Sequence, residues 1–135
     1  MRRSIATVSL SGTLAEKLEA AAAARFDAVE IFENDLLFFD GAPRQVRARV
    51  ADLGLKISLY QPFRDFEGVP DDQLRRNLDR AERKFDVMQE LGATMMLVCS
   101  SVSPQAADDD ARAAAQLREL AERAARRGLS IGYEA

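Results

Sequence analysis

Five short apolar runs typical of β-strands alternate along this chain with longer runs in which apolar residues recur every three or four positions, as they do in helices. A parallel neighbour can be reached only through a long connection, and a helix is the usual one. The alternation therefore predicts an α/β fold in which five parallel strands alternate with four helices through right-handed crossovers. The expected strands are residues 4–10, 28–34, 56–62, 94–100 and 130–135.

Capping signals mark the ends of the expected helices. Thr13 and Glu16 form a capping box, in which each side chain can satisfy a free amide of the first helical turn. A proline near the start and a glycine after the end bracket two further helices, at Pro43/Gly54 and Pro70/Gly92.

The acidic run at residues 108–110 has the composition of a metal-ligand trio. It lies, however, where the fourth helix is expected to begin, and acids there complement the positive end of the helix dipole. We interpret the run as a helix cap.

Chain length limits how much of such a fold is present. A complete (β/α)₈ TIM barrel typically needs about 250 residues, whereas this chain has 135 and stops directly after its fifth expected strand. We therefore expect residues 1–135 to form the N-terminal part of a TIM barrel, and thus only a partial barrel.

Composition and charge exclude several classes of function. The formal net charge of −3 offers no long-range attraction to nucleic acid, and the first residues lack the long apolar segment of a secretory signal. We expect neither a nucleic acid nor a membrane as partner, and a cytoplasmic location.

Nucleophilic catalysis has little support in the sequence. The only cysteine, Cys99, lies in a strand-like run and is interpreted as core filling. The chain has no histidine, which removes a Ser-His-Asp triad and any histidine metal site within these residues.

Polar residues at the expected strand ends are the candidates for a site, because active sites of TIM barrels gather at the C-terminal face. Arg64 could hold a carboxylate in a forked pair of hydrogen bonds, and Gln61 could donate to a hydroxyl or ketone oxygen. An Arg64 surface pair with Asp65 or Glu67, and a merely solvated Glu134, remain the alternatives. The candidates are Ser9, Glu33, Gln61, Arg64, Ser100 and Glu134.

Several runs of this sequence resemble the bacterial 3-dehydroshikimate dehydratases, members of the xylose isomerase-like group of TIM barrels. The group also holds sugar-phosphate isomerases and family-two abasic-site endonucleases, and some dehydratases are fused to a dioxygenase-like domain. The matching runs are RSIATVSLSGT at 3–13, VEIFENDLL at 29–37, QPFRDFEG at 61–68, RAERKFD at 80–86, MQELG at 88–92, LVCS at 97–100 and GYEA at 132–135.

The resemblance implies a divalent metal, Mg, Mn or Co, with Glu134 of the Tyr-Glu-Ala motif as its first ligand. The other ligands and a histidine for proton transfer would lie beyond Ala135, so we expect little activity from these residues alone. The metal would polarise the ketone of 3-dehydroshikimate, so that a base can remove the adjacent proton and loss of water gives protocatechuate. Arg64 would anchor the carboxylate of this small-molecule substrate, while the sequence identifies no catalytic base.

Arg25 and Ala28 stand where this family commonly has glycines. An arginine after a helix costs roughly 1 kcal/mol or more if it keeps a left-handed conformation. We expect a weaker fold at this turn without the loss of a site residue.

Two alternatives remain open. A sugar or sugar-phosphate isomerase acting on a polyol would use the same barrel and a bound metal in the same way. Alternatively, the chain is a non-catalytic half-barrel that self-associates through its open sheet edges.

Overall fold

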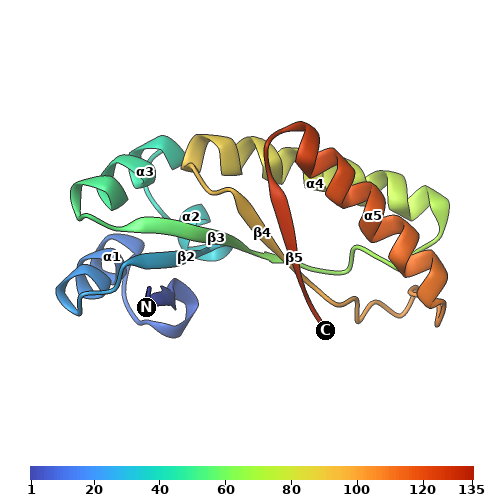
Figure 1. The fold of residues 1–135 in the computed structure, drawn as a ribbon, viewed down its shortest axis with the longest axis horizontal. Helices are drawn as coiled ribbons and strands as arrows, with labels where there is room; N and C mark the ends of the chain where they lie inside the picture. Colours follow the sequence, from blue (N-terminus) through green and yellow to red (C-terminus); the bar gives the residue numbers. More distant parts are fainter. The chain divides into compact units, whose positions relative to one another are not determined.

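The computed structural model describes residues 1–135 and confirms the predicted α/β class, with five strands that alternate with helices (Figure 1). The four predicted helices are present as α1, α3, α4 and α5. The elements are β1 Ser4–Ala6, η1 Thr7–Ser9, α1 Leu14–Ala23, β2 Ala28–Phe32, α2 Glu33–Leu37, α3 Pro43–Asp52, β3 Lys56–Phe63, α4 Asp71–Leu91, β4 Met95–Cys99, α5 Asp110–Arg126 and β5 Ser130–Glu134.

The first two strands are shorter than predicted, and each runs directly into a short helical segment. β1 ends at Ala6 and passes into the 3₁₀-helix η1, where the Ser9 hydroxyl donates to the Ala6 carbonyl oxygen at 2.6 Å. β2 ends at Phe32 and passes into α2, a helix that the sequence analysis did not predict. The acids Glu33 and Asp35 occupy the first turn of α2, where they complement its dipole.

The chain forms two compact units, and each is described by itself. Unit 1 contains residues 1–61 and 87–94. Its strands pair in parallel, β1 with β2 and β2 with β3, with one irregularity in register between Val29 and Glu30. The core of unit 1 is built from strand and helix residues that are at most 2% exposed, namely Val29, Ile31, Leu18, Ala21, Val46 and Val50.

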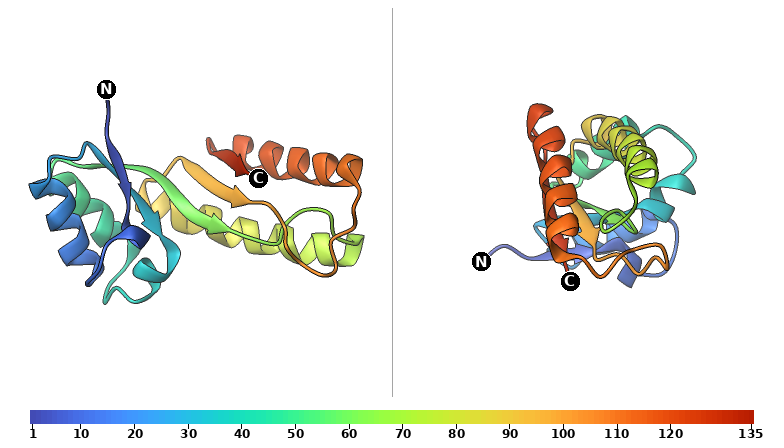
Figure 2. Two further views of the ribbon diagram at one scale, coloured as in Figure 1. Left: turned by 90° about the horizontal axis from the view of Figure 1, so that it is seen from below. Right: turned by 90° about the vertical axis from the view of Figure 1, so that its right-hand side faces the viewer.

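Unit 2 contains residues 62–86 and 95–135. β4 and β5 pair in parallel so that Cys99 lies opposite Glu134, and α5 lies next to β5 (Figure 2). Arg127, just after α5, donates to the Glu82 side chain at 3.0 Å and thereby ties α5 to α4. The core of unit 2 consists of fully buried side chains, including Phe63, Phe66, Phe85, Val98 and Leu120.

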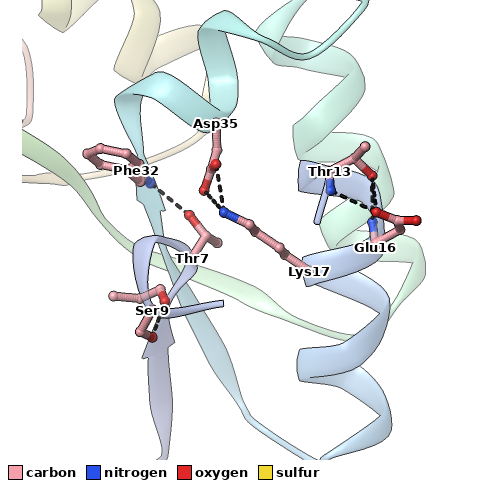
Figure 3. Close-up of polar contacts among 8 residues, drawn as sticks. Thr7, Ser9, Thr13, Glu16, Lys17, Phe32 and Asp35 are labelled. Atoms are coloured by element: carbon pink, nitrogen blue, oxygen red, sulfur yellow. Dashed lines mark hydrogen bonds and ion pairs between the residues drawn. The ribbon is translucent and has the colours of Figure 1, made fainter. Parts of the chain in front are cut away.

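The predicted helix starts are confirmed in detail. The Thr13 amide donates to Glu16 Oε2 at 2.7 Å, and the Glu16 amide donates to Thr13 Oγ1 at 3.3 Å, which completes the capping box of α1 (Figure 3). Asp109 caps α5 by accepting from the Arg112 amide at 2.9 Å. The acidic run at 108–110 therefore acts as a cap, as predicted.

Arg25 adopts the left-handed conformation that the sequence analysis considered, with φ of 59°. The Arg25 amide donates to the Ala22 carbonyl at 2.9 Å, and the Phe26 amide donates to the Ala21 carbonyl at 3.1 Å. This is the Schellman pattern of a helix end, which glycine usually supplies. The expected strain at this turn is therefore present in the backbone.

None of the helices is both long enough and apolar enough to cross a membrane.

Candidate functional site

The C-terminal ends of β4 and β5 bring Cys99, Ser100 and Glu134 together in unit 2. The Ser100 amide donates to the Glu134 carbonyl oxygen at 2.8 Å, so the parallel ladder continues to the last residue of β5. The Cys99 thiol donates to Glu134 Oε2 at 3.8 Å, a weak bond typical of sulfur. Two of the predicted site residues, Ser100 and Glu134, therefore lie at neighbouring strand ends.

Glu67, in the segment after β3, reaches the same strand ends from a buried position. It is 4% exposed, and its Oε1 accepts from the Ser101 amide at 2.6 Å and from the Tyr133 hydroxyl at 3.1 Å. Its second oxygen, Oε2, is buried and has no hydrogen-bond partner.

The alternative that the sequence left open for Arg64, a surface pair with Asp65 or Glu67, is not formed. Asp65 Oδ1 accepts instead from the Val102 amide at 3.1 Å, and Glu67 is occupied by Ser101 and Tyr133. Arg64 itself is exposed, and its carbonyl oxygen accepts from the Arg80 guanidinium at 3.2 Å. Its own guanidinium thus lies at the surface of unit 2, available to a ligand.

Cys99 is not core filling, because its side chain is only partly buried beside Glu134. Desolvation raises the pKa of the thiol above 9.0; the Arg64 charge lowers this pKa, whereas Glu134 and Glu67 raise it. The thiol therefore stays protonated at neutral pH and acts as a donor to Glu134. This agrees with the sequence argument against a nucleophilic cysteine.

The pKa of Tyr133 is also raised, first by desolvation and then by the negative charge of Glu67. The phenol remains a hydrogen-bond donor to Glu67 well into the alkaline range. The Tyr133 hydroxyl is therefore protonated at neutral pH and links β5 to Glu67.

In unit 1, the predicted residue Gln61 lies within β3 opposite Phe32, the last residue of β2, and the predicted residue Glu33 begins α2 directly after β2. Gln61 Nε2 donates to Glu30 Oε2 at 3.0 Å, a partner on β2 that the sequence analysis did not identify. Glu33 raises the pKa of Tyr60, although desolvation of the phenol is the larger cause. Gln61 keeps its amide oxygen and a second N–H for a ligand, because only one N–H is used on Glu30.

The remaining candidate of unit 1, Ser9, serves the turn after β1 by its bond to Ala6. The neighbouring contacts are structural as well: Thr7 Oγ1 accepts from the Phe32 amide at 3.0 Å, and Lys17 Nζ pairs with Asp35 Oδ1 at 2.8 Å (Figure 3). Thr7 is fully buried, so its hydroxyl fixes the end of β2 against the end of β1.

Glu134, at the end of β5, has the type of side chain that binds divalent cations, since Mg²⁺ and Mn²⁺ prefer carboxylate oxygens. Glu134 is exposed, and only its Oε2 is engaged, by Cys99. Within residues 1–135, no three His, Cys, Asp or Glu side chains are grouped so as to hold a metal ion. Glu134 can therefore contribute to a metal site but does not form one with the other side chains described.

Glu67 and Tyr133 are the two residues at these strand ends that sequence reasoning undervalued. A charged residue in a loop is ordinarily read as solvated, and a strand-end tyrosine has no distinctive signal. One signal was present: Glu67 stands between Phe66 and Val69, and an acid within an apolar run indicates burial with hydrogen-bond partners.

Comparison with known proteins places this geometry in a family. The chain is 69% identical over 135 residues to 3-dehydroshikimate dehydratase of Pseudomonas aeruginosa and 66% identical to that of Pseudomonas putida. Each match covers 100% of this chain and 21% of the relative, so the chain spans only about a fifth of the length of these curated relatives.

A solved structure, described as a xylose isomerase-like TIM barrel/4-hydroxyphenylpyruvate dioxygenase fusion protein, matches with a TM-score of 0.98 and 66% identity. The match covers 100% of this chain and 22% of that one. The family model for xylose isomerase-like TIM barrels matches residues 18–135. The chain therefore belongs to the xylose isomerase-like TIM barrel family.

Proposed function

We propose that the protein is a 3-dehydroshikimate dehydratase, which removes water from 3-dehydroshikimate to form protocatechuate. The observation that carries this proposal is the 69% identity with the Pseudomonas aeruginosa enzyme over the whole of this chain. The runs at residues 61–68 and 132–135, which include Arg64 and Glu134, lie within that match.

The proposed roles follow from the chemistry of each side chain. The exposed Arg64 guanidinium is a planar fork of donors suited to the substrate carboxylate. Gln61 retains an N–H for a hydroxyl or ketone oxygen, and Ser100 and Glu33 are further polar groups at strand ends. The Cys99 thiol holds one oxygen of Glu134 and leaves the other open.

We further propose that Glu134 is a ligand of a divalent cation, Mg, Mn or Co, with its remaining ligands and the proton-transfer group supplied from outside residues 1–135. Such an ion supplies Lewis-acid polarisation of the substrate ketone when bound. These residues alone would then be inactive.

The test uses the protein expressed from its full reading frame. Incubation with 3-dehydroshikimate and Mg²⁺, Mn²⁺ or Co²⁺ should produce protocatechuate, measured by its aromatic absorbance, and removal of metal with EDTA should stop the reaction. Glu134→Ala should lower turnover by about 100-fold or more, because it removes a ligand of the catalytic ion.

Glu122→Ala is the matched control, since Glu122 is an exposed acid on α5. It should keep full turnover. Absence of protocatechuate with the unchanged protein would contradict the proposed function, whereas undiminished turnover in Glu134→Ala would contradict only the role of Glu134.

A further inference from the structure

Glu67 has no role in the function proposed above, yet it is an unusual acid. It is 4% exposed, and its neighbours Phe66, Gly68 and Val69 are buried as well. Burial of a carboxylate is unfavourable unless hydrogen bonds compensate for the lost water. The hydrogen bonds of Glu67 therefore indicate its role.

One oxygen of Glu67 holds the neighbours of two proposed site residues. Oε1 accepts from the Ser101 amide at 2.6 Å and from the Tyr133 hydroxyl at 3.1 Å. Ser101 directly follows Ser100, and Tyr133 directly precedes Glu134. A single atom thus links the segment after β4 to the end of β5.

The other oxygen shows that stability alone does not account for an acid at this position. Oε2 is buried without any hydrogen-bond partner. An unpaired buried acceptor destabilises the folded state, and an apolar side chain would avoid that penalty. What an apolar residue could not provide is the acceptor that Ser101 and Tyr133 share.

We propose, building on the dehydratase function, that Glu67 is a positioning residue, which sets Ser100 and Glu134 relative to each other by holding Ser101 and Tyr133 with one oxygen. It acts through these two neighbours and does not itself touch the substrate. The backbone hydrogen bond from the Ser100 amide to the Glu134 carbonyl oxygen joins the same two segments.

Two substitutions at Glu67 distinguish the effect of the shared hydrogen-bond acceptor from the effect of the negative charge. In Glu67→Gln the amide oxygen can replace Oε1 for both donors, so kcat and KM should stay within about threefold of the unchanged protein. Glu67→Ala removes the acceptor, and kcat/KM should fall by about 10- to 100-fold, because small displacements of catalytic groups have effects of that order. Tyr133→Phe removes one of the two bonds and should be intermediate.

Gln116→Leu is the matched control for a buried polar side chain of unit 2. Gln116 is 5% exposed, accepts from the Val69 amide at 3.2 Å and donates to the Val69 carbonyl at 2.7 Å. Its loss should lower the melting temperature, because the Val69 amide and carbonyl lose their hydrogen-bond partner, but kcat/KM measured well below that temperature should not change.

Hydrogen exchange gives a readout that does not depend on activity. The Ser101 amide should exchange faster in Glu67→Ala and keep its protection in Glu67→Gln, measured on peptides that cover residues 97–104. All variants are prepared in the protein from its full reading frame.

Three results would overturn the positioning role: kcat/KM equal to that of the unchanged protein in Glu67→Ala, a loss of kcat/KM in Gln116→Leu as large as in Glu67→Ala, or a loss in Glu67→Gln as large as in Glu67→Ala. If the unchanged protein makes no protocatechuate, the proposed function fails instead, and the exchange rates at Ser101 still decide whether Glu67 holds this segment.

Discussion

Arg25 is the residue at which side-chain type and backbone conformation conflict most directly. Its φ of 59° lies in the left-handed region, where a Cβ atom costs about 1–2 kcal/mol. The two backbone bonds that close α1 require this conformation, and the arginine side chain is exposed. The strain is therefore local and removable.

Arg25→Gly should raise the free energy of unfolding by about 0.5–1 kcal/mol, because relief of the left-handed strain exceeds the extra entropy of glycine in the unfolded chain. Urea denaturation of the full-length protein measures the shift in midpoint. Arg25→Ala keeps the Cβ atom and should leave the midpoint nearly unchanged. A midpoint raised equally by both variants would mean that the arginine side chain, and not the backbone, carries the strain.

At the scale of elements, helix ends were read from the sequence more successfully than strand ends. The signals at Thr13, Glu16 and the acidic run at 108–110 act within one turn, so the local sequence contains them in full. The end of β2 depends instead on Thr7, which accepts from the Phe32 amide across the sheet. No local pattern contains that contact, and η1 and α2 were consequently missed.

The capping box of α1 should make stability depend on pH in acid. Hydrogen bonds from the Thr13 amide and hydroxyl lower the pKa of Glu16 below its ordinary 4.5. A lowered folded-state pKa contributes stability above pH 4.5 that is lost as the pH falls through the folded-state value.

Glu16→Gln retains a capping side chain but does not titrate. The stability difference between the unchanged protein and Glu16→Gln, taken from urea midpoints at successive pH values, should therefore decrease as the pH falls below 4.5. Glu122→Gln is the matched control, because it removes an exposed carboxylate of α5 that caps no helix. A constant difference for Glu16→Gln across this range would contradict the linkage.

At the scale of the whole molecule, the alternation of apolar patterns predicted the α/β class correctly, and the matching runs spread from residue 3 to residue 135 predicted the family correctly. The site was harder to predict. Strand-end position placed Ser100 beside Glu134, but the burial of Glu67 and its link to Tyr133 arise only from packing. Self-association through open sheet edges and a cytoplasmic location stay predictions.

Substrate recognition by Arg64 can be tested with paired substrates. Arg64→Ala should raise KM for 3-dehydroshikimate by about 10-fold or more, because a forked charge-assisted pair with the carboxylate is lost. Its effect on a cyclic enone without the carboxylate should be small. Arg75→Ala, which removes an exposed arginine on α4, is the control and should leave KM unchanged.

Equal effects of Arg64→Ala on both substrates would contradict the proposed contact between the guanidinium and the substrate carboxylate. Turnover of a polyol sugar in preference to the cyclic acid would favour the isomerase alternative over the dehydratase.

The ion pair between Lys17 and Asp35 also allows local opening between α1 and α2 to be measured. The Lys17 side chain is 8% exposed, whereas Lys56 at the start of β3 lies open to solvent. Amine-reactive labels therefore reach Lys17 only during moments when α1 and α2 separate, while Lys56 reports the intrinsic speed of the reagent. The ratio of the two labelling rates measures how often this end of unit 1 opens in the native protein.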